Sequence, residues 1–228
     1  MPQVSPARRS ARSAGRTGPP GLGGKYGLLL LVLLSTYLLA AFNASKLVGA
    51  VQIGLYLTVL LLGLRASPLP RRPATLVGVV ALAGSAAALG ATVTGTETGA
   101  GAAQIWKGLI LLLTVVIIVR RVLAKSTVTV QSIYGALSAY IIIGLMFAAF
   151  YAAIWHLGGS PFFASGKTAS FQTFQYFSFT TLTTLGYGDF TAAGNGGQAI
   201  AVLEALTGQV FLATLVARLV AAFRAPAE

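Results

Sequence analysis

The sequence predicts an all-α membrane protein with six membrane-spanning helices and one shorter helix that enters the bilayer without crossing it. Composition is the first reason, because hydrophobic residues make up 56% of the 228 residues and charged residues only 9%. So few charges cannot solvate the surface of a globule. The second reason is that the apolar residues gather in stretches that approach or exceed the roughly 18 to 20 residues needed to cross a bilayer as a helix.

Six apolar stretches predict the spans. The first could instead belong to a cleaved signal peptide, because residues 41–44 resemble a small-residue cleavage site. Its apolar run and the tail before it are both long for a signal peptide, so a span is favoured, and cleavage would leave five spans. The predicted spans are 27–42, 47–64, 75–94, 103–119, 132–157 and 198–221.

A further apolar segment, at 170–182, lies between the fifth and sixth spans and is rich in Phe and Tyr. It is too short to cross the bilayer. Backbone without regular structure is tolerated at membrane depth only where protein or a water-filled path surrounds it. We therefore expect a re-entrant helix followed by a loop that returns to the same side of the membrane.

The basic residues predict how the chain is oriented, because cytoplasmic loops carry an excess of Lys and Arg. With the N-terminus inside, six spans place all but three of the 16 Lys and Arg residues on the cytoplasmic side. We therefore expect a multi-pass protein of the cell membrane with both termini in the cytoplasm. The exceptions are Lys46, Lys107 and Lys167.

Four regions follow along the chain. Residues 1–25 are basic and poor in large apolar side chains, which is typical of a disordered cytoplasmic tail. We expect a four-helix membrane domain at 26–125, a second membrane domain with the re-entrant segment at 126–224, and a short tail at 225–228. No ligand-sensing domain is expected after the last span.

Composition also excludes several functions. The net charge of +12 lies in short clusters between apolar runs rather than in a basic groove, so no nucleic acid is expected as a partner. Without cysteine, neither a disulfide nor a thiolate metal site can form. One His and one Asp provide no recognisable acid–base pair or metal cluster, so we expect no catalytic residues, no enzymatic activity and no cofactor.

The most informative residues follow the re-entrant helix. A cation can leave water only if fixed oxygens replace its hydration shell, and backbone carbonyls can supply them when φ takes both signs. Two glycines separated by one residue allow this at low cost. The first residue of the segment adds a hydroxyl, and its tyrosine is large enough to wedge outward and hold an opening. The segment consists of Thr184, Leu185, Gly186, Tyr187 and Gly188.

The stretch from Thr181 to Asp189 closely resembles the signature of the potassium channel family, Thr-x-Thr-Thr-Val-Gly-Tyr-Gly-Asp, with Leu185 in place of the usual Val. The resemblance covers about 130–221 as outer helix, pore helix, filter and inner helix. It implies that the five residues from Thr184 to Gly188 form a selectivity filter that binds permeant K⁺ ions. One chain supplies a quarter of each oxygen ring, so the resemblance also implies a homotetramer with a tetrameric pore in the lipid bilayer.

The resemblance also points to residues that support the filter. Tyr176 and Phe177 occupy positions where many members of the family have tryptophans around the filter, although both could simply pack. Thr180 replaces a Glu that some members place behind the filter. Two further residues of the signature, Thr183 and Asp189, are expected to support the filter as well.

Two residues of the last span have open roles. Glu204 is an ionisable group inside a membrane helix, which is costly unless it faces protein or water. It could support the filter from behind, line the central cavity, or contact a neighbouring helix. Gly208 lies four residues later on the same helix face, and it is either a gating hinge or a site of close helix packing.

The fourth span predicts weak dependence on voltage. A voltage sensor needs Arg or Lys at every third position, whereas 103–119 contains only Lys107. The sequence does not indicate what opens the channel. The expected function is passive K⁺ conduction. The alternatives are a weakly selective cation channel, which usually loses Tyr187, and a non-conducting scaffold or regulatory subunit, which would not need the filter.

Overall fold

The computed structural model describes residues 25–42, 46–66, 70–124, 128–166 and 169–224, and the predicted tails at 1–25 and 225–228 lie almost entirely outside them. The described residues form seven helices and no strand beyond one isolated bridge, between Phe163 and Ala192. The helices are α1 (Lys25–Phe42), α2 (Lys46–Ala66), α3 (Arg71–Thr94), α4 (Glu97–Leu123), α5 (Val130–Gly158), α6 (Phe171–Leu182) and α7 (Asn195–Arg224).

The predicted all-α membrane class is confirmed. Five of the described helices, α2, α3, α4, α5 and α7, are long and apolar enough to cross a membrane. The predicted first span forms α1, whose apolar part, Tyr26–Leu39, is shorter than the other five. A total of six spans therefore stays a prediction, as does cleavage near 41–44.

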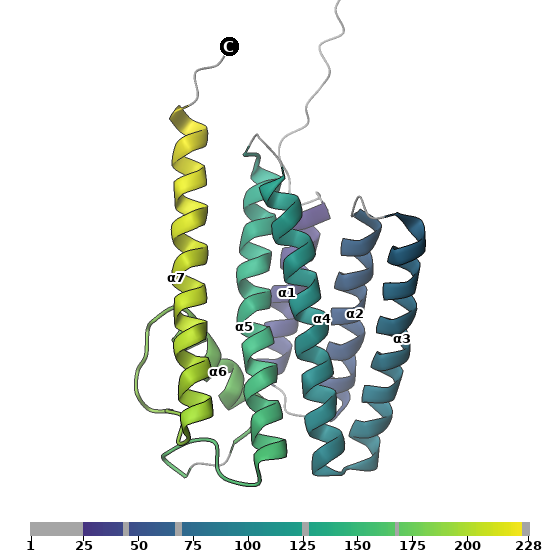
Figure 1. Ribbon diagram of the computed structural model, residues 1–228, viewed down its shortest axis with the longest axis vertical. Helices are drawn as coiled ribbons and strands as arrows, with labels where there is room; N and C mark the ends of the chain where they lie inside the picture. The colour runs from purple at the N-terminus through teal and green to yellow at the C-terminus, as the bar shows by residue number, and fades with distance from the viewer. Residues whose placement is uncertain (1–24, 43–45, 67–69, 125–127, 167–168, 225–228) are drawn as a thin grey trace, which may run out of the picture.

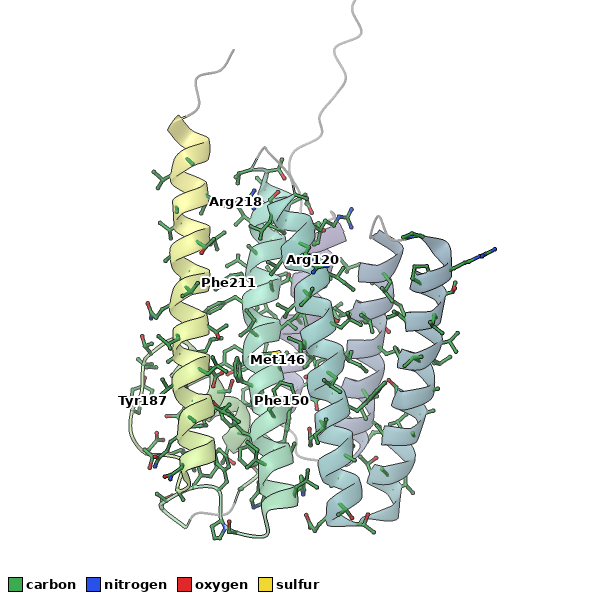
Figure 2. The ribbon with its side chains drawn as sticks, in the orientation of Figure 1. Arg120, Met146, Phe150, Tyr187, Phe211 and Arg218 are labelled. Carbon is green, nitrogen blue, oxygen red and sulfur yellow. The ribbon has the colours of Figure 1, made fainter. Side chains whose placement is uncertain are left out.

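The long helices run up and down the bundle in alternation, as Figure 1 shows. The first residue of α1 and the last residue of α7 lie at the same end, whereas α6 lies beside α5 and α7 toward the other end. Arg120 and Arg218 lie on the side of the bundle where α1 begins, away from Tyr187 (Figure 2). This separation is consistent with the predicted excess of basic residues on one side of the membrane.

Helix α5 is the most enclosed element. Its side chains Ile142, Leu145, Ala148 and Tyr151 have no exposed surface, because α4, α1 and α6 all pack against it. Since α1 reaches across to this helix, it also meets the predicted second domain: the Tyr37 ring lies 4.9 Å from that of Phe179 on α6. The first helix thus braces the short helix that precedes the loop.

An apolar groove of about 450 Å³ lies between the C-terminal half of α7 and the helices α4 and α5. Val122 of α4, Ala136 and Ala139 of α5, and Val210 of α7 are among its lining residues. One hydrogen bond crosses it, in which the Arg218 guanidinium donates to the backbone carbonyl of Val122 over 2.9 Å. Helix α7 therefore contacts its own chain mainly through its other half.

Candidate functional site

The site begins with α6, and the sequence of this helix determines the residue at which it starts. Ser170 forms a capping box: its hydroxyl accepts from the Thr173 amide, while the Thr173 hydroxyl accepts from the Ser170 amide. This satisfies backbone donors that the first turn leaves free. Phe174 then packs against Phe163, with ring centroids 5.2 Å apart. The cap and this aromatic contact fix where the helix starts.

Helix α6 contains 12 residues, so it is about 18 Å long and cannot cross a bilayer. Its end is fixed by hydrogen bonds of the residues that follow. The amides of Leu185 and Gly186 both donate to the carbonyl of Thr180, over 2.8 and 3.1 Å. Thr180 therefore contacts the filter through its backbone, whereas its hydroxyl donates to Phe177 within the helix.

The five candidate filter residues have an alternating backbone. Thr184, Gly186 and Gly188 have φ values of 57°, 50° and 79°. Leu185 and Tyr187 between them are not among the residues with positive φ. Positive φ is rare for a residue other than glycine and costs of order 1–3 kcal/mol, and it persists where surrounding contacts enforce it. Alternating handedness turns successive amides to one side of the chain and successive carbonyls to the other. This is the backbone that the sequence predicted for a row of cation-binding oxygens.

Toward the C-terminal end of this segment, Tyr176 packs against Tyr187. Its ring is parallel to that of Tyr187, with centroids 6.4 Å apart. Desolvation and the interaction with Asp189 raise the pKa of Tyr176 above its ordinary value. Phe177 instead faces α5, with its ring 5.0 Å from Tyr151. Of the two predicted aromatic supports, only Tyr176 touches a filter side chain.

Asp189 and Thr183, the two other predicted support residues of the signature, also differ in whether their side chains lie near filter residues. Asp189 lies near enough to Tyr176 to contribute to the raised pKa of that phenol, and its support of the filter stays a prediction. The hydroxyl of Thr183 donates to the carbonyl of Phe179 over 2.7 Å, one helical turn back. Its side chain is therefore committed to the end of α6 and not to the filter.

Glu204 is fully buried behind α6. Its two carboxylate oxygens accept separate hydrogen bonds, one from the Tyr151 hydroxyl over 2.6 Å and one from the Ser178 hydroxyl over 2.5 Å. One side chain on α7 thus holds α5 and α6 together. Both oxygens face these two helices, so the predicted contact to neighbouring helices is present, and support of the filter from behind stays a prediction.

Gly208 lies against the last residue of α6. A Cβ at this position would lie 2.2 Å from the carbonyl oxygen of Leu182, which no packing arrangement allows without a shift. The Tyr140 hydroxyl donates to the same carbonyl over 3.2 Å. Helix α7 runs through Gly208 without interruption. The close-packing role is therefore present in the structure, and the hinge stays a prediction.

Sequence reasoning missed three residues of the site. Tyr140 and Tyr151 on α5 reach the Leu182 carbonyl and the Glu204 carboxylate, and the Gln209 side-chain amide donates to the Thr184 hydroxyl over 3.1 Å. A glutamine in the middle of an apolar span is unusual and could have been noticed for that reason. The two tyrosines gave no comparable signal.

Helix α4 differs from the predicted fourth span at its start. Its first residue is Glu97, six positions before the predicted start at 103, because the Thr96 hydroxyl caps the helix by accepting from the Gly99 amide. The Glu97 carboxylate lies 2.6 Å from Nδ1 of His156 at the end of α5. Lys107 is buried and lies 5.4 Å from the centre of the Phe171 ring.

No group of three or more His, Asp or Glu side chains that could hold a metal ion occurs within the described part of the chain. The oxygen-rich feature of the site is instead the backbone from Thr180 to Gly188. The carbonyl oxygens of this backbone can replace the water molecules in the hydration shell of a cation.

Comparison with known protein families gives one match. Residues 139–225 match a family described as ion channel, and the match covers most of α5, all of α6, the filter segment and α7. Neither the curated proteins nor the solved structures contain a match. The C-terminal part of the chain therefore resembles an ion-conducting domain, which supports passive ion conduction through the membrane and a non-enzymatic role.

Proposed function

We propose that the protein is the subunit of a homotetrameric channel that conducts K⁺ selectively through the carbonyl oxygens of Thr184 to Gly188. The observation that carries the proposal is the alternating sign of φ at Thr184, Gly186 and Gly188. Four such segments around one axis would stack rings of carbonyl oxygens at the spacing a dehydrated K⁺ needs. The Thr184 hydroxyls would add one more ring at the inner end.

The exposure of the filter in a single chain supports a tetramer. The side chains of Tyr187 and Leu185 are 68% and 55% exposed. Large apolar surfaces of this kind mark interaction sites in proteins. On α7, Val202, Leu206 and Val210 are exposed as well, and three more copies of the chain would cover part of this helix. A closed ring with fourfold symmetry also completes the oxygen rings.

The proposed channel lies in the cell membrane, with both termini in the cytoplasm and the outer end of the filter outside. The clustering of Arg120 and Arg218 at the end opposite the filter supports this orientation. Asp189 at the outer end adds negative charge that favours cations at the entrance. The proposal includes no cofactor beyond the permeant K⁺ ions.

The test is flux from liposomes that contain the purified protein. Vesicles loaded with K⁺, Na⁺ or the large cation N-methylglucamine are diluted into an ion-free buffer, and the charge movement is recorded. We expect rapid flux with K⁺, at least about tenfold slower flux with Na⁺, and none with the large cation. The variant Tyr187→Asp, which removes the ring stacked on Tyr176, should bring the K⁺ and Na⁺ fluxes close together.

The same experiment separates the alternatives. Equal K⁺ and Na⁺ fluxes in the unmodified protein would indicate a weakly selective cation channel. Absence of flux with every cation, in protein that remains folded and assembled, would favour a scaffold or regulatory subunit. Either result would overturn the proposal of potassium selectivity.

A further inference from the structure

We propose that Gln209 is a positioning residue for the innermost cation site of the filter, where it sets the direction of the Thr184 hydroxyl. This inference rests on the proposed function and deepens it, because it names a residue outside the filter that shapes one ion site. The contact that carries it is the hydrogen bond from Nε2 of Gln209 to Oγ1 of Thr184, 3.1 Å long.

The hydrogen bonds of this hydroxyl leave little freedom. A threonine hydroxyl has one hydrogen and two lone pairs. The Thr184 hydroxyl donates its hydrogen to the carbonyl of Thr183 over 2.7 Å, and the Gln209 amide takes one lone pair. One lone pair is left. A cation at the inner end of the filter would therefore meet an oxygen lone pair and never the hydroxyl hydrogen.

Without the amide, the hydroxyl could rotate. A rotated hydroxyl would point its hydrogen toward the ion for part of the time, and a positive hydrogen repels a cation. Cation binding would then require the hydroxyl to be turned back, which reduces the observed affinity. Gln209 removes this requirement by holding the hydroxyl in its binding direction before the ion arrives.

Two neighbours of Gln209 make the contact possible. Gly208 lets α7 approach the end of α6 so closely that a Cβ would lie 2.2 Å from the Leu182 carbonyl oxygen. Glu204, one turn earlier, fixes the helix through its bonds to Ser178 and Tyr151. These contacts fix the distance of α7 from α6 and its rotation about its own axis, so that the Gln209 side chain reaches Thr184.

The experiment measures K⁺ binding through thermal stability of the full-length protein in detergent. A ligand that binds only the folded state stabilises it by RT ln(1 + [L]/Kd), so the rise of the unfolding temperature with ligand concentration reports the apparent Kd. The unfolding midpoint is followed while KCl replaces N-methylglucamine chloride at constant ionic strength, and the same titration is made with NaCl. We expect Gln209→Met, which keeps the length but removes the donor, to weaken apparent K⁺ affinity about three- to tenfold.

The matched control is Gln198→Met, the same substitution on the same helix. Gln198 donates to the carbonyl of Ala192 outside the filter, so its loss should leave apparent K⁺ affinity unchanged. Any general effect of methionine on α7 would appear in both variants, and only an effect through the filter would be confined to Gln209→Met.

Two backgrounds test whether Gln209 acts through the hydroxyl. In Thr184→Val, which keeps the shape but lacks the hydroxyl, Gln209→Met should cause no further loss of K⁺ affinity. In Thr184→Ser, which keeps the hydroxyl, the three- to tenfold loss should remain. If Thr184→Val is too unstable to measure, Thr184→Ser still tests the proposal. An unchanged K⁺ affinity after Gln209→Met in that variant would contradict it.

The outcomes are distinct. If the unmodified protein is stabilised equally by K⁺ and Na⁺, the proposed function itself fails. If it prefers K⁺ but Gln209→Met binds K⁺ as the unmodified protein does, only the role of Gln209 is overturned. An equal loss in the presence and absence of the Thr184 hydroxyl also overturns it, since Gln209 would then act by another route.

Discussion

Glu204 shows how one buried side chain can organise three helices. A carboxylate in a membrane helix is expensive to bury and is tolerated only when its oxygens are satisfied. Here two hydroxyls from different helices do this. The Ser178 oxygen also lies 2.7 Å from the carbonyl of Gly144. Because a hydroxyl has one hydrogen, Ser178 can donate either to Glu204 or to Gly144, but not to both at once.

This geometry predicts different outcomes for two substitutions. In Glu204→Gln, the new amide can donate to Ser178, which then turns its hydrogen to Gly144, so the loss of stability should be small, about 1 kcal/mol. In Glu204→Ala, both hydroxyls lose a partner and a cavity forms, and we expect a loss of about 3 kcal/mol or more. Unfolding of the purified protein measures both.

The control for the first substitution is Glu97→Gln, because the Glu97 side chain is 76% exposed and should matter little. If the filter depends on Glu204, the glutamine variant should also change K⁺ selectivity or inactivation while it remains assembled. Equal stability of the Gln and Ala variants, with unchanged conduction in both, would contradict this role.

A second prediction at the residue scale concerns Gly208. The variant Gly208→Ala places a Cβ against the Leu182 carbonyl, so either α6 or α7 must move, and we expect a destabilisation of about 1–3 kcal/mol. The control is Gly90→Ala on α3, where a Cβ would meet nothing within 4 Å and a helix former should be neutral or slightly stabilising. Similar unfolding temperatures for the two variants would count against the close contact.

At the scale of the elements, α4 carries too little charge to sense voltage strongly. Within its apolar part only Lys107 is charged, since Arg120 and Arg121 lie in its last turn. Each charge that crosses the whole membrane field contributes about 2.3 kcal/mol per 100 mV. Buried beside Phe171, Lys107 is also poorly placed to move.

We therefore predict that open probability changes only weakly with voltage in planar bilayers. The effective gating charge should be below about one elementary charge per subunit. Lys107→Met should leave the slope of the curve almost unchanged. A steep curve whose slope falls in this variant would show that Lys107 moves through the field.

The elements also show which parts of the structure the sequence could predict. Apolar length located every long helix, because bilayer thickness constrains length directly. Helix ends were less accurate: α4 begins at Glu97 instead of 103, because a local hydrogen bond to Thr96 sets the start. In the site, the alternating backbone was predictable from two glycines. Contacts such as Tyr151 with Glu204 join residues 53 positions apart and depend on how each helix is rotated, which hydropathy does not encode.

At the scale of the whole molecule, the single chain leaves much of its apolar surface on α7 uncovered. Its filter residues are exposed and most of α7 has no partner within the described chain, as only 11% of its apolar window is buried. Helix α5, by contrast, is 72% buried in the same sense. A helix of this hydropathy can face lipid, but the polar filter backbone beside it cannot. The proposed filter therefore depends on assembly with further copies of the chain.

We predict that chemical cross-linking of the protein in membranes gives a ladder that stops at four chains of 23.4 kDa each. In detergent, light scattering corrected for the micelle should give the mass of the same assembly. The variant Gln198→Met, with its substitution at the outer end of α7, should assemble normally. A ladder that ends at two chains would be incompatible with complete oxygen rings.

The groove between α7 and α5 also gives α7 the form of a lever. The helix is held at Glu204, Gly208 and Gln209, whereas beyond them the stretch that ends at Arg224 borders the apolar groove, which the Arg218 hydrogen bond to Val122 crosses. That stretch is about 24 Å long, so a tilt of roughly 10° would move its far end by about 4 Å. The same tilt would shift the side chain of Gln209 by only a fraction of an ångström. Large movements of the C-terminal end of α7 would thus reach the candidate filter as small displacements.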